Sequence, residues 1–198
     1  MTRQERELFL RSIKGARNYL EFGSGGSTIA ALDSLDGTSA VHSVESDGDW
    51  LLDMEQRYGA IRDGLSSGRL KLHHVDIGKV GDWGSPLDEK RKAHWPEYSA
   101  KVFEEEAPFD VVLIDAQFRG ACGLRTILNT ALDVVIMFHD FSMRRPDCKV
   151  LLKYLDIIEA ADTLVVFKKK KKLDRKALAA DYEAFKYIPR SGVNGPVE

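Results

Sequence analysis

An apolar run leads into a glycine-rich loop in the stretch Asn18-Tyr-Leu-Glu21-Phe-Gly23-Ser24-Gly25-Gly26-Ser27-Thr28. The three glycines let the backbone turn tightly and approach a ligand more closely than a side chain would permit. A second apolar run ends at Val44-Glu45, about twenty residues after the first glycine. A nucleotide-binding βαβ unit needs this separation between its loop and the acid that binds a ribose. The stretch therefore predicts a strand, a ligand-binding loop and a helix, followed by a strand that ends at Glu45.

The loop lacks one glycine of the dinucleotide-binding pattern G-x-G-x-x-G, because Thr28 stands at the third position. This departure argues against a pyrophosphate seated on the N-terminus of the following helix. A ligand the size of one nucleoside is favoured, with Glu45 binding ribose hydroxyls and Glu21 facing a cationic group. S-adenosylmethionine, an adenosine with an amino-acid tail, has these features. A structural glycine-rich turn in another α/β protein is the alternative.

The composition is that of a globular protein with a core of its own. The 198 residues are 43% hydrophobic and 30% charged, with a formal net charge of −2. This length predicts one domain over residues 1–190, followed by a flexible tail over residues 191–198. The near-neutral charge argues against a nucleic-acid partner, and we expect the lysine run over residues 168–172 to be a solvated strand edge.

Other features predict a cytoplasmic protein. No apolar run reaches the roughly 20 residues that a membrane helix needs, and the polar N-terminus does not resemble a secretory signal. Cys122 and Cys148 form no CxxC pair, which is typical of a reducing compartment. We therefore expect no membrane partner, and the sequence does not define the oligomeric state.

Strands alternate with helices along most of the chain, which predicts an α/β fold. We expect a doubly wound, mainly parallel, Rossmann-like sheet of about six or seven strands with helices on both faces. Strands are expected over residues 17–22, 39–45, 69–75, 109–114, 133–138 and 162–167, and a seventh has no clear position. Helices are expected over residues 3–14, from 27, along the apolar positions of 50–61, before 108, and over 119–132, 150–158 and 174–185.

The segment over residues 77–98 interrupts this alternation. It contains Trp83 and Trp95 among glycines, prolines and charged residues, and it is too polar for a core segment. Long connections of this kind are frequently functional, so this one is a candidate lid or wall of a substrate site. An ordinary surface excursion is the alternative.

Residues capable of chemistry follow two of the expected strands. Asp115 comes after residues 109–114, and His139-Asp140 come after residues 133–138. The carboxyl ends of parallel strands meet at one edge of a sheet, so these side chains are expected in one crevice. His139 suits a general base, whereas Asp115 and Asp140 are oxygen ligands suited to Mg²⁺. Both routes are open at this point.

Two further groups of polar residues bear on this crevice. Arg119 and three later arginines can pair with these acids or bind an anionic acceptor, and an ordinary surface position is the alternative. His73 and His74 are adjacent in a strand, where neighbouring side chains point to opposite faces, so they are not expected to share a metal.

These motifs resemble those of the class I S-adenosylmethionine-dependent methyltransferases over residues 19–167. The glycine loop matches the first motif, although Ser27 replaces a usual glycine, and Glu45, Asp76 and Asp115 match the acids after the next strands. The resemblance implies that the loop binds the methionyl part of S-adenosylmethionine, Glu45 the ribose and Asp76 the adenine amino group. The cofactor site expected in this way consists of Glu21, Gly23, Ser24, Gly25, Gly26, Glu45, Ser46 and Asp76.

The resemblance also bears on the methyl acceptor. Asp115 is followed by Ala116-Gln117, not by the Pro-Pro-aromatic set of methyltransferases that act on planar amino nitrogens. Acids after these two strands resemble those of catechol-type and some sugar O-methyltransferases. We therefore expect O-methylation of a small molecule or sugar, with Asp115, His139 and Asp140 as catalytic residues and the two aspartates as the place for any Mg²⁺. A nicotinamide-dependent oxidoreductase and a non-catalytic nucleoside-binding module are the alternatives.

Overall fold

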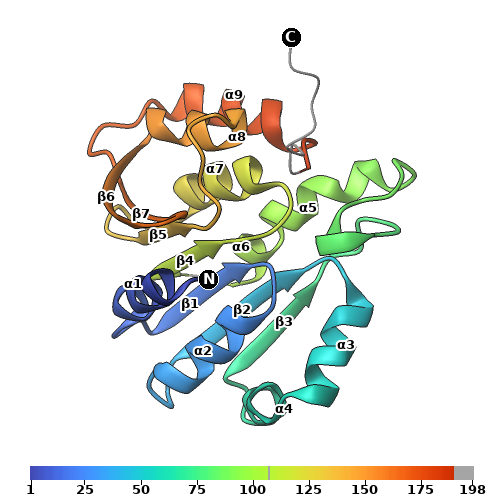
Figure 1. The fold of residues 1–198 in the computed structure, drawn as a ribbon. Coiled ribbons are helices and arrows are strands. Elements are labelled where there is room, and N and C mark those ends of the chain that lie inside the picture. The colour runs from blue at the N-terminus through green and yellow to red at the C-terminus, as the bar shows by residue number, and fades with distance from the viewer. Residues whose placement is uncertain (107, 190–198) are drawn as a thin grey trace.

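The computed structural model describes residues 1–106 and 108–189, so the tail expected over residues 191–198 lies outside the described residues. In the described part, seven strands form one sheet with helices on its two faces (Figure 1). The strands are β1 Asn18–Phe22, β2 Ala40–Glu45, β3 Leu70–His74, β4 Val111–Ile114, β5 Val135–Phe138, β6 Leu155–Ala161 and β7 Leu164–Lys169. The α-helices are α1 Arg3–Ile13, α2 Gly26–Ser34, α3 Gly48–Arg57, α4 Gly59–Ser66, α5 Trp95–Ala100, α6 Val102–Glu105, α7 Arg119–Asn129, α8 Pro146–Lys149 and α9 Arg175–Phe185. None of these described helices has the length and apolar character needed to cross a membrane.

The sheet order is β3-β2-β1-β4-β5-β7-β6, which confirms the predicted α/β fold. β1 pairs in parallel with β2 and β4, and the parallel arrangement continues to β3 and to β5. β7 runs antiparallel to both of its neighbours, β5 and β6. The carboxyl ends of the parallel strands meet at one edge of the sheet, which is where α/β proteins bind ligands.

The strand without a position in the sequence is β6, and it lies where a helix is predicted over residues 150–158. The helical part ends early, because a 3-10 turn over Val150–Lys153 follows α8 and the chain then enters β6. Ile157 and Ile158 are 53% and 51% exposed on this edge strand, and the pairing with β7 shifts between Ile157 and Glu159. Consecutive apolar residues at a bulged edge have no period of two, so the helix prediction is wrong here.

A second difference concerns the helix predicted along residues 50–61. The backbone of Tyr58 is extended, with φ −113° and ψ 119°, and it divides this region into α3 and α4. Met54 and Ile61 of the predicted apolar face are buried, whereas Trp50 and Tyr58 are exposed. Gly59 follows the break, and a glycine inside a helical pattern weakens the helix.

Two apolar cores lie on opposite faces of the sheet. α1 to α4, coloured blue to cyan in Figure 1, cover one face, and α5 to α9 cover the other. Side chains alternate along β1, so that Tyr19 packs in the first core while Leu20 and Phe22 pack in the second. The sheet is thus buried on both sides, as a parallel sheet requires.

The long connection between β3 and β4 contains 3-10 turns at Asp82–Gly84 and Lys92–His94, followed by α5 and α6. α6 is the helix predicted before residue 108. Trp95 is only 4% exposed, its Nε1 donates a hydrogen bond to the Ile77 carbonyl oxygen at 3.0 Å, and its ring packs against Phe118. The expectation that both tryptophans lie outside the core is therefore wrong for Trp95, because α5 turns this side chain toward α7. Trp83 is 87% exposed.

Candidate active site

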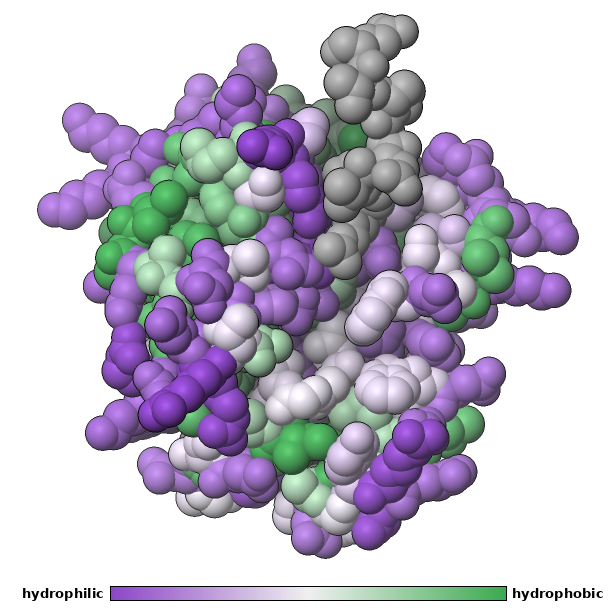
Figure 2. Space-filling model, in the orientation of Figure 1, coloured by the Kyte–Doolittle hydropathy of each residue, from purple (hydrophilic) through white to green (hydrophobic). Residues whose placement is uncertain are grey.

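A cleft of about 1000 Å³ lies at the carboxyl ends of the central strands. The β1–α2 loop, the ends of β2, β4 and β5, the N-terminal helix and the turn Asp82–Gly84 form its walls. In Figure 2, pale residues of intermediate hydropathy gather across the middle of the molecule, with hydrophilic side chains around them. The expected site residues in the cleft lining are Gly23, Ser24, Gly25, Gly26, Glu45, Asp115, His139 and Asp140.

The three glycines of the loop differ in the space around the position that a side chain would occupy. Gly23 has φ +96°, and a Cβ on it would collide with the backbone carbonyl of Asp115. Gly23 therefore allows β1 to pass close to the segment that follows β4. Gly25 and Gly26 have no described atom within 4 Å of a Cβ built on them. Both line the cleft, so the space beside them is available to a ligand.

Glu45 lies at the end of β2, opposite the glycine loop, and is 8% exposed. Its Oε2 accepts a hydrogen bond from the Ser24 amide at 3.1 Å. Its Oε1 accepts hydrogen bonds from the amides of Ser46 at 2.6 Å and Asp47 at 3.1 Å. Trp50 donates from its indole Nε1 to the Ser24 carbonyl oxygen at 2.9 Å. These bonds hold the Glu45 carboxylate and the Trp50 ring against Ser24 of the loop.

Glu21 is fully buried beneath the glycine loop and does not belong to the described lining of the cleft. Its carboxylate accepts hydrogen bonds from the Thr28 hydroxyl, from Ser43 Oγ at 2.9 Å and from the Tyr19 hydroxyl at 3.0 Å. Burial raises the pKa of Glu21 to about 7, although these hydrogen bonds act in the opposite direction. Glu21 therefore holds the loop from below, and the expectation that it faces a ligand cation is not met by this geometry.

Asp76 and Ser46 are also outside the described lining of the cleft. Asp76 accepts a hydrogen bond from the Gly78 amide at 2.9 Å, and its Oδ2 lies 3.2 Å from Arg91 Nη2. Ser46 Oγ donates to the Gly84 carbonyl oxygen at 3.3 Å and so holds the turn Asp82–Gly84 against the end of β2. Ser46 supports a wall of the cleft, and the contact of Asp76 with an adenine stays a prediction.

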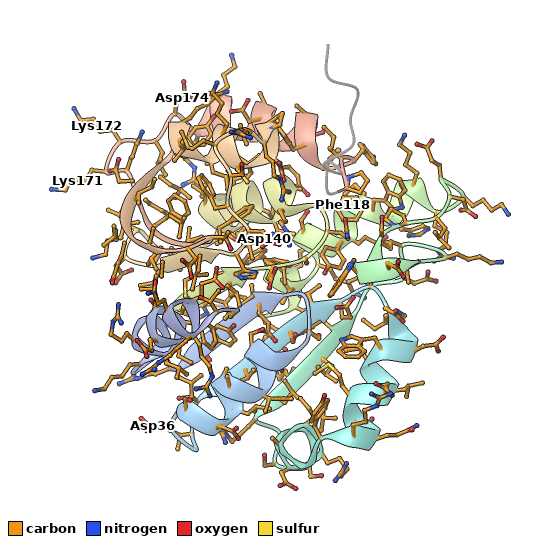
Figure 3. The ribbon with its side chains drawn as sticks, in the orientation of Figure 1. Asp36, Phe118, Asp140, Lys171, Lys172 and Asp174 are labelled. Atoms are coloured by element: carbon orange, nitrogen blue, oxygen red, sulfur yellow. The ribbon has the colours of Figure 1, made fainter. Side chains whose placement is uncertain are left out.

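Asp115, His139 and Asp140 lie together, with one ligand atom of each within 4.8 Å of the others. His139 Nδ1 lies 3.1 Å from Asp115 Oδ2 and 3.8 Å from Asp140 Oδ1. Asp140 stands near the centre of the molecule in Figure 3 and has φ +54°, a left-handed conformation that aspartate tolerates better than most residues. The predicted meeting of these side chains at the strand ends is confirmed.

Arg119 pairs with both acids, which is one of the roles that its position in the sequence leaves open. Its Nη2 lies 3.0 Å from Asp115 Oδ1 and 3.4 Å from Asp140 Oδ2, and the residue is 3% exposed. It also donates from Nε to the Ala116 carbonyl oxygen at 2.8 Å and from Nη1 to the His139 carbonyl oxygen. The guanidinium is thus a fixed positive charge behind the two carboxylates.

Glu5 of α1 completes this cluster, although the sequence does not single it out. It is 2% exposed, and its Oε2 lies 3.3 Å from His139 Nε2. Burial alone would raise its pKa, but hydrogen bonds from the Thr163 hydroxyl and from the Thr2 and Thr163 amides outweigh it and lower the pKa to about 2. The only sequence signal is the capping box Thr2-x-x-Glu5, which predicts a helix start and not where that helix packs.

Both ring nitrogens of His139 face carboxylates. Burial alone would lower the pKa of His139, but the nearby carboxylates of Asp115 and Asp140 raise it above its usual value, with a further contribution from Glu5. His139 is therefore a stronger base than an isolated imidazole. The Asp115–His139 pair can take up a proton from a group that reaches Asp115 through the cleft.

The connection between β3 and β4 contributes one wall of the cleft. Trp83 lines it with φ +60°, and its carbonyl oxygen accepts a hydrogen bond from Gln117 Nε2 at 3.0 Å. Met1, Arg6 and Phe9 line the cleft as well, and the sequence offers no signal for them because the N-terminal helix packs there only in the folded chain.

No protein-family model matches the sequence, and no curated protein matches it either. Among solved structures, a methyltransferase-like protein from Silicibacter pomeroyi is 28% identical over 96% of each chain, with a TM-score of 0.79. An O-methyltransferase from Bacillus cereus in complex with SAH is 16% identical over 85% of this chain and 82% of its own, with a TM-score of 0.57. An RNA methyltransferase from Salinibacter ruber in complex with S-adenosyl-L-homocysteine is 13% identical over 87% of this chain and 95% of its own, with a TM-score of 0.54. These similarities confirm the resemblance drawn from the sequence motifs.

Proposed function

Since the chain is a class I S-adenosylmethionine-dependent methyltransferase by its fold and by its similarity to the Silicibacter pomeroyi protein, we propose that it methylates a hydroxyl oxygen of a small molecule or sugar. One observation carries this proposal: the open glycine loop and Glu45 share a single cleft with Asp115, His139 and Asp140. The similar Bacillus cereus structure, an O-methyltransferase with SAH bound, supports the same cofactor and reaction class.

The residues around the glycine loop fit S-adenosylmethionine, which supplies a methyl group on a positively charged sulfur. The space beside Gly25 and Gly26 would take the methionyl part, since no described atom fills it. The Glu45 carboxylate, held by three backbone amides, would accept hydrogen bonds from the ribose hydroxyls. Trp50 would cover the loop from the side of α3.

The other half of the cleft would bind and deprotonate the acceptor. Transfer of a methyl group depends chiefly on alignment of the nucleophile with the carbon that it attacks, and a hydroxyl must also lose its proton. Asp115 would accept the hydrogen bond of the acceptor hydroxyl, and the proton would pass to His139, 3.1 Å from Asp115. Glu5 would act from the opposite ring nitrogen and hold the imidazole in position.

The same donor set would suit a divalent cation, but Arg119 argues against one. Its guanidinium lies within 3.0 Å of Asp115 and 3.4 Å of Asp140. A cation placed between these carboxylates would be repelled by a buried positive charge that cannot lose its proton. We therefore favour proton transfer to His139 over metal activation by Asp115 and Asp140.

The surface and the sheet bear on the alternative functions. The net charge is −2, and Lys171 and Lys172 point away from the molecule in Figure 3, far from Asp140, so we propose a small acceptor and not a nucleic acid. A dinucleotide-binding sheet has the order 3-2-1-4-5-6, whereas here the antiparallel β7 lies between β5 and β6. This difference disfavours a nicotinamide-dependent oxidoreductase.

The experiment is a methyl-transfer assay with isotopically labelled S-adenosylmethionine and a panel of phenols, catechols and sugars, each with a chelator and with added Mg²⁺. We expect a product methylated on oxygen whose rate of formation does not change with the chelator. Methylation on nitrogen, or methylation that needs Mg²⁺, would contradict the proposal. Tight binding of S-adenosylhomocysteine without methylation of any compound would favour the non-catalytic binding module.

A further inference from the structure

A second cluster of ionisable side chains lies on β2, on β3 and after α6, outside the described lining of the large cleft. The rings of His42 and His73 are stacked with centroids 5.4 Å apart, and His42 Nδ1 lies 3.1 Å from His73 Nε2. Glu106 places a carboxylate oxygen so that the three ligand atoms lie within 4.8 Å of one another. We propose that His42, His73 and Glu106 form a zinc site with a water molecule as the fourth ligand.

The parallel pairing of β2 and β3 brings the two histidines together. His42 stands opposite Lys71, and His73 stands opposite Val44, two residues further along β2. Residues two apart on a strand share one face, so both imidazoles project from the same side of the sheet. His74, the sequence neighbour of His73, is directed elsewhere, since its Nε2 lies 3.2 Å from the Ser46 carbonyl oxygen.

The separation of the two nitrogens fits tetrahedral zinc. Zinc binds histidine nitrogen at about 2.0–2.1 Å, which places two nitrogens in a tetrahedral shell about 3.3 Å apart. The observed separation of 3.1 Å requires only a small adjustment of the rings. One carboxylate and two imidazoles are a donor set that zinc accepts, and a water molecule can complete it.

The surroundings of the two imidazoles also fit a metal site. When His73 Nε2 binds the metal, its Nδ1 carries the proton, and a metal-bound histidine usually donates that proton to a carboxylate, a backbone carbonyl or water. Glu105 Oε2 lies 3.8 Å from His73 Nδ1 on a side chain that is 49% exposed and able to move closer. His42 packs edge-on against Phe109, with ring centroids 5.2 Å apart, which limits rotation of its imidazole.

The protonation states support binding of a cation at neutral pH. Burial lowers the pKa of His42 to about 4 and also lowers the pKa of His73, so both imidazoles are neutral, as metal binding requires. A hydrogen bond from Lys71 Nζ to Glu106 Oε1 at 2.6 Å lowers the pKa of Glu106 and keeps it charged. The second carboxylate oxygen can bind the ion, and Lys71, whose side chain is 48% exposed, can turn to solvent.

Solvent reaches the cluster through a second cleft of about 190 Å³ that borders His73 and Glu105. A zinc ion there would tie β2, β3 and the segment before β4 together. The alternative is a plain hydrogen bond between the two histidines, with no metal. Neither the zinc site nor the metal-free hydrogen bond depends on S-adenosylmethionine or on a methyl acceptor.

The experiment is a calorimetric titration of zinc chloride into the metal-free full-length protein, prepared without a histidine tag. We expect a site with a dissociation constant in or below the micromolar range, and at least about tenfold weaker binding in His73→Gln and Glu106→Gln. His94→Gln is the matched control, since His94 is an exposed histidine 2.7 Å from Glu97 Oε1, and it should bind zinc as the wild type does. His139→Asn should also keep the affinity, which separates this site from the cluster in the large cleft.

Absence of zinc binding, or equal affinity in wild type, His73→Gln and Glu106→Gln, would overturn the proposal. Loss of the site in His139→Asn would overturn it as well, because the zinc would then sit in the large cleft. The melting temperature of each variant shows whether it is folded. If His73→Gln does not fold, Glu106→Gln, whose side chain is partly exposed, carries the test.

Discussion

Replacing Glu5 by Gln removes the charge that connects α1 to His139 and to the turn between β6 and β7. The carboxylate accepts hydrogen bonds from Thr2 N at 2.6 Å, Thr163 N at 3.0 Å and Thr163 Oγ1 at 2.7 Å. Lowering of its pKa from 4.5 to about 2 corresponds to about 3 kcal/mol in favour of the charged form, at about 1.4 kcal/mol per unit. Glutamine keeps some of these hydrogen bonds, so we expect Glu5→Gln to lose about 1–3 kcal/mol of stability.

Thermal unfolding measures this loss, and Glu7→Gln is the matched control on the same helix. For a domain of this size, 1 kcal/mol shifts the melting temperature by about 2–4 °C, so Glu5→Gln should melt about 2–12 °C below the wild type. Glu7 is 56% exposed and pairs only with Arg3 among the described residues, and such surface pairs contribute little. The Glu7→Gln protein should therefore melt close to the wild type.

The pH dependence of stability provides a second test of the same prediction. Because the pKa of Glu5 is lowered in the folded state, its contribution is present above pH 4.5 and is lost as the pH falls toward about 2. The wild type should lose stability over this range, and Glu5→Gln should lack that part of the loss. Removal of the charge should also lower the pKa of His139, measured by NMR of the imidazole. Equal melting of Glu5→Gln and Glu7→Gln, with an unchanged His139 pKa, would refute the reasoning.

Three further outcomes are expected from the cleft. Gly25→Val should abolish binding of S-adenosylhomocysteine, measured by calorimetry, while its melting temperature stays that of the wild type. Gly23→Ala should melt at a lower temperature, because its Cβ would collide with the Asp115 carbonyl. Normal binding by Gly25→Val would exclude the loop as the cofactor site. In steady-state assays, His139→Asn should lower turnover by about 10²–10⁴-fold with little change in cofactor affinity, and unchanged turnover would remove His139 from the mechanism. Methyl transfer should fall as the pH drops through the raised pKa of His139, so a rate profile without a transition above pH 6.5 would contradict its role as a base.

The helices and strands could be predicted where the spacing of apolar residues follows from burial of that element alone. β4 is buried on both faces and is continuously apolar, so its four residues and the helix after it are recognisable. β6 could not be predicted, because Leu155 and Ile158 continue the helical spacing of the apolar residues Val150, Leu151 and Tyr154 that precede the strand. The extended backbone of Tyr58 could not be predicted either, since the helical spacing of apolar residues continues through the break between α3 and α4.

The site could be predicted in part for a similar reason. Asp115 and the His139-Asp140 pair directly follow parallel strands, and topology alone brings such residues together. Glu5 reaches His139 from the first helix of the chain, and no local pattern reports contacts over that separation. Alternation along β1 explains the position of Glu21, which shares the face of Tyr19 and lies beneath α2 instead of in the cleft.

The position of the cofactor can be tested by one calorimetric titration of S-adenosylhomocysteine into the wild type, Glu45→Gln and Glu55→Gln. The Glu45→Gln variant would lose charged hydrogen bonds to the ribose, each contributing roughly 1.5–3 kcal/mol. It should therefore bind S-adenosylhomocysteine at least about tenfold more weakly. Glu55 is an exposed residue of α3, outside the described lining of the cleft, and its variant should bind as the wild type does. Equal affinity in all three proteins, or no binding to the wild type, would contradict a cofactor site between the glycine loop and Glu45.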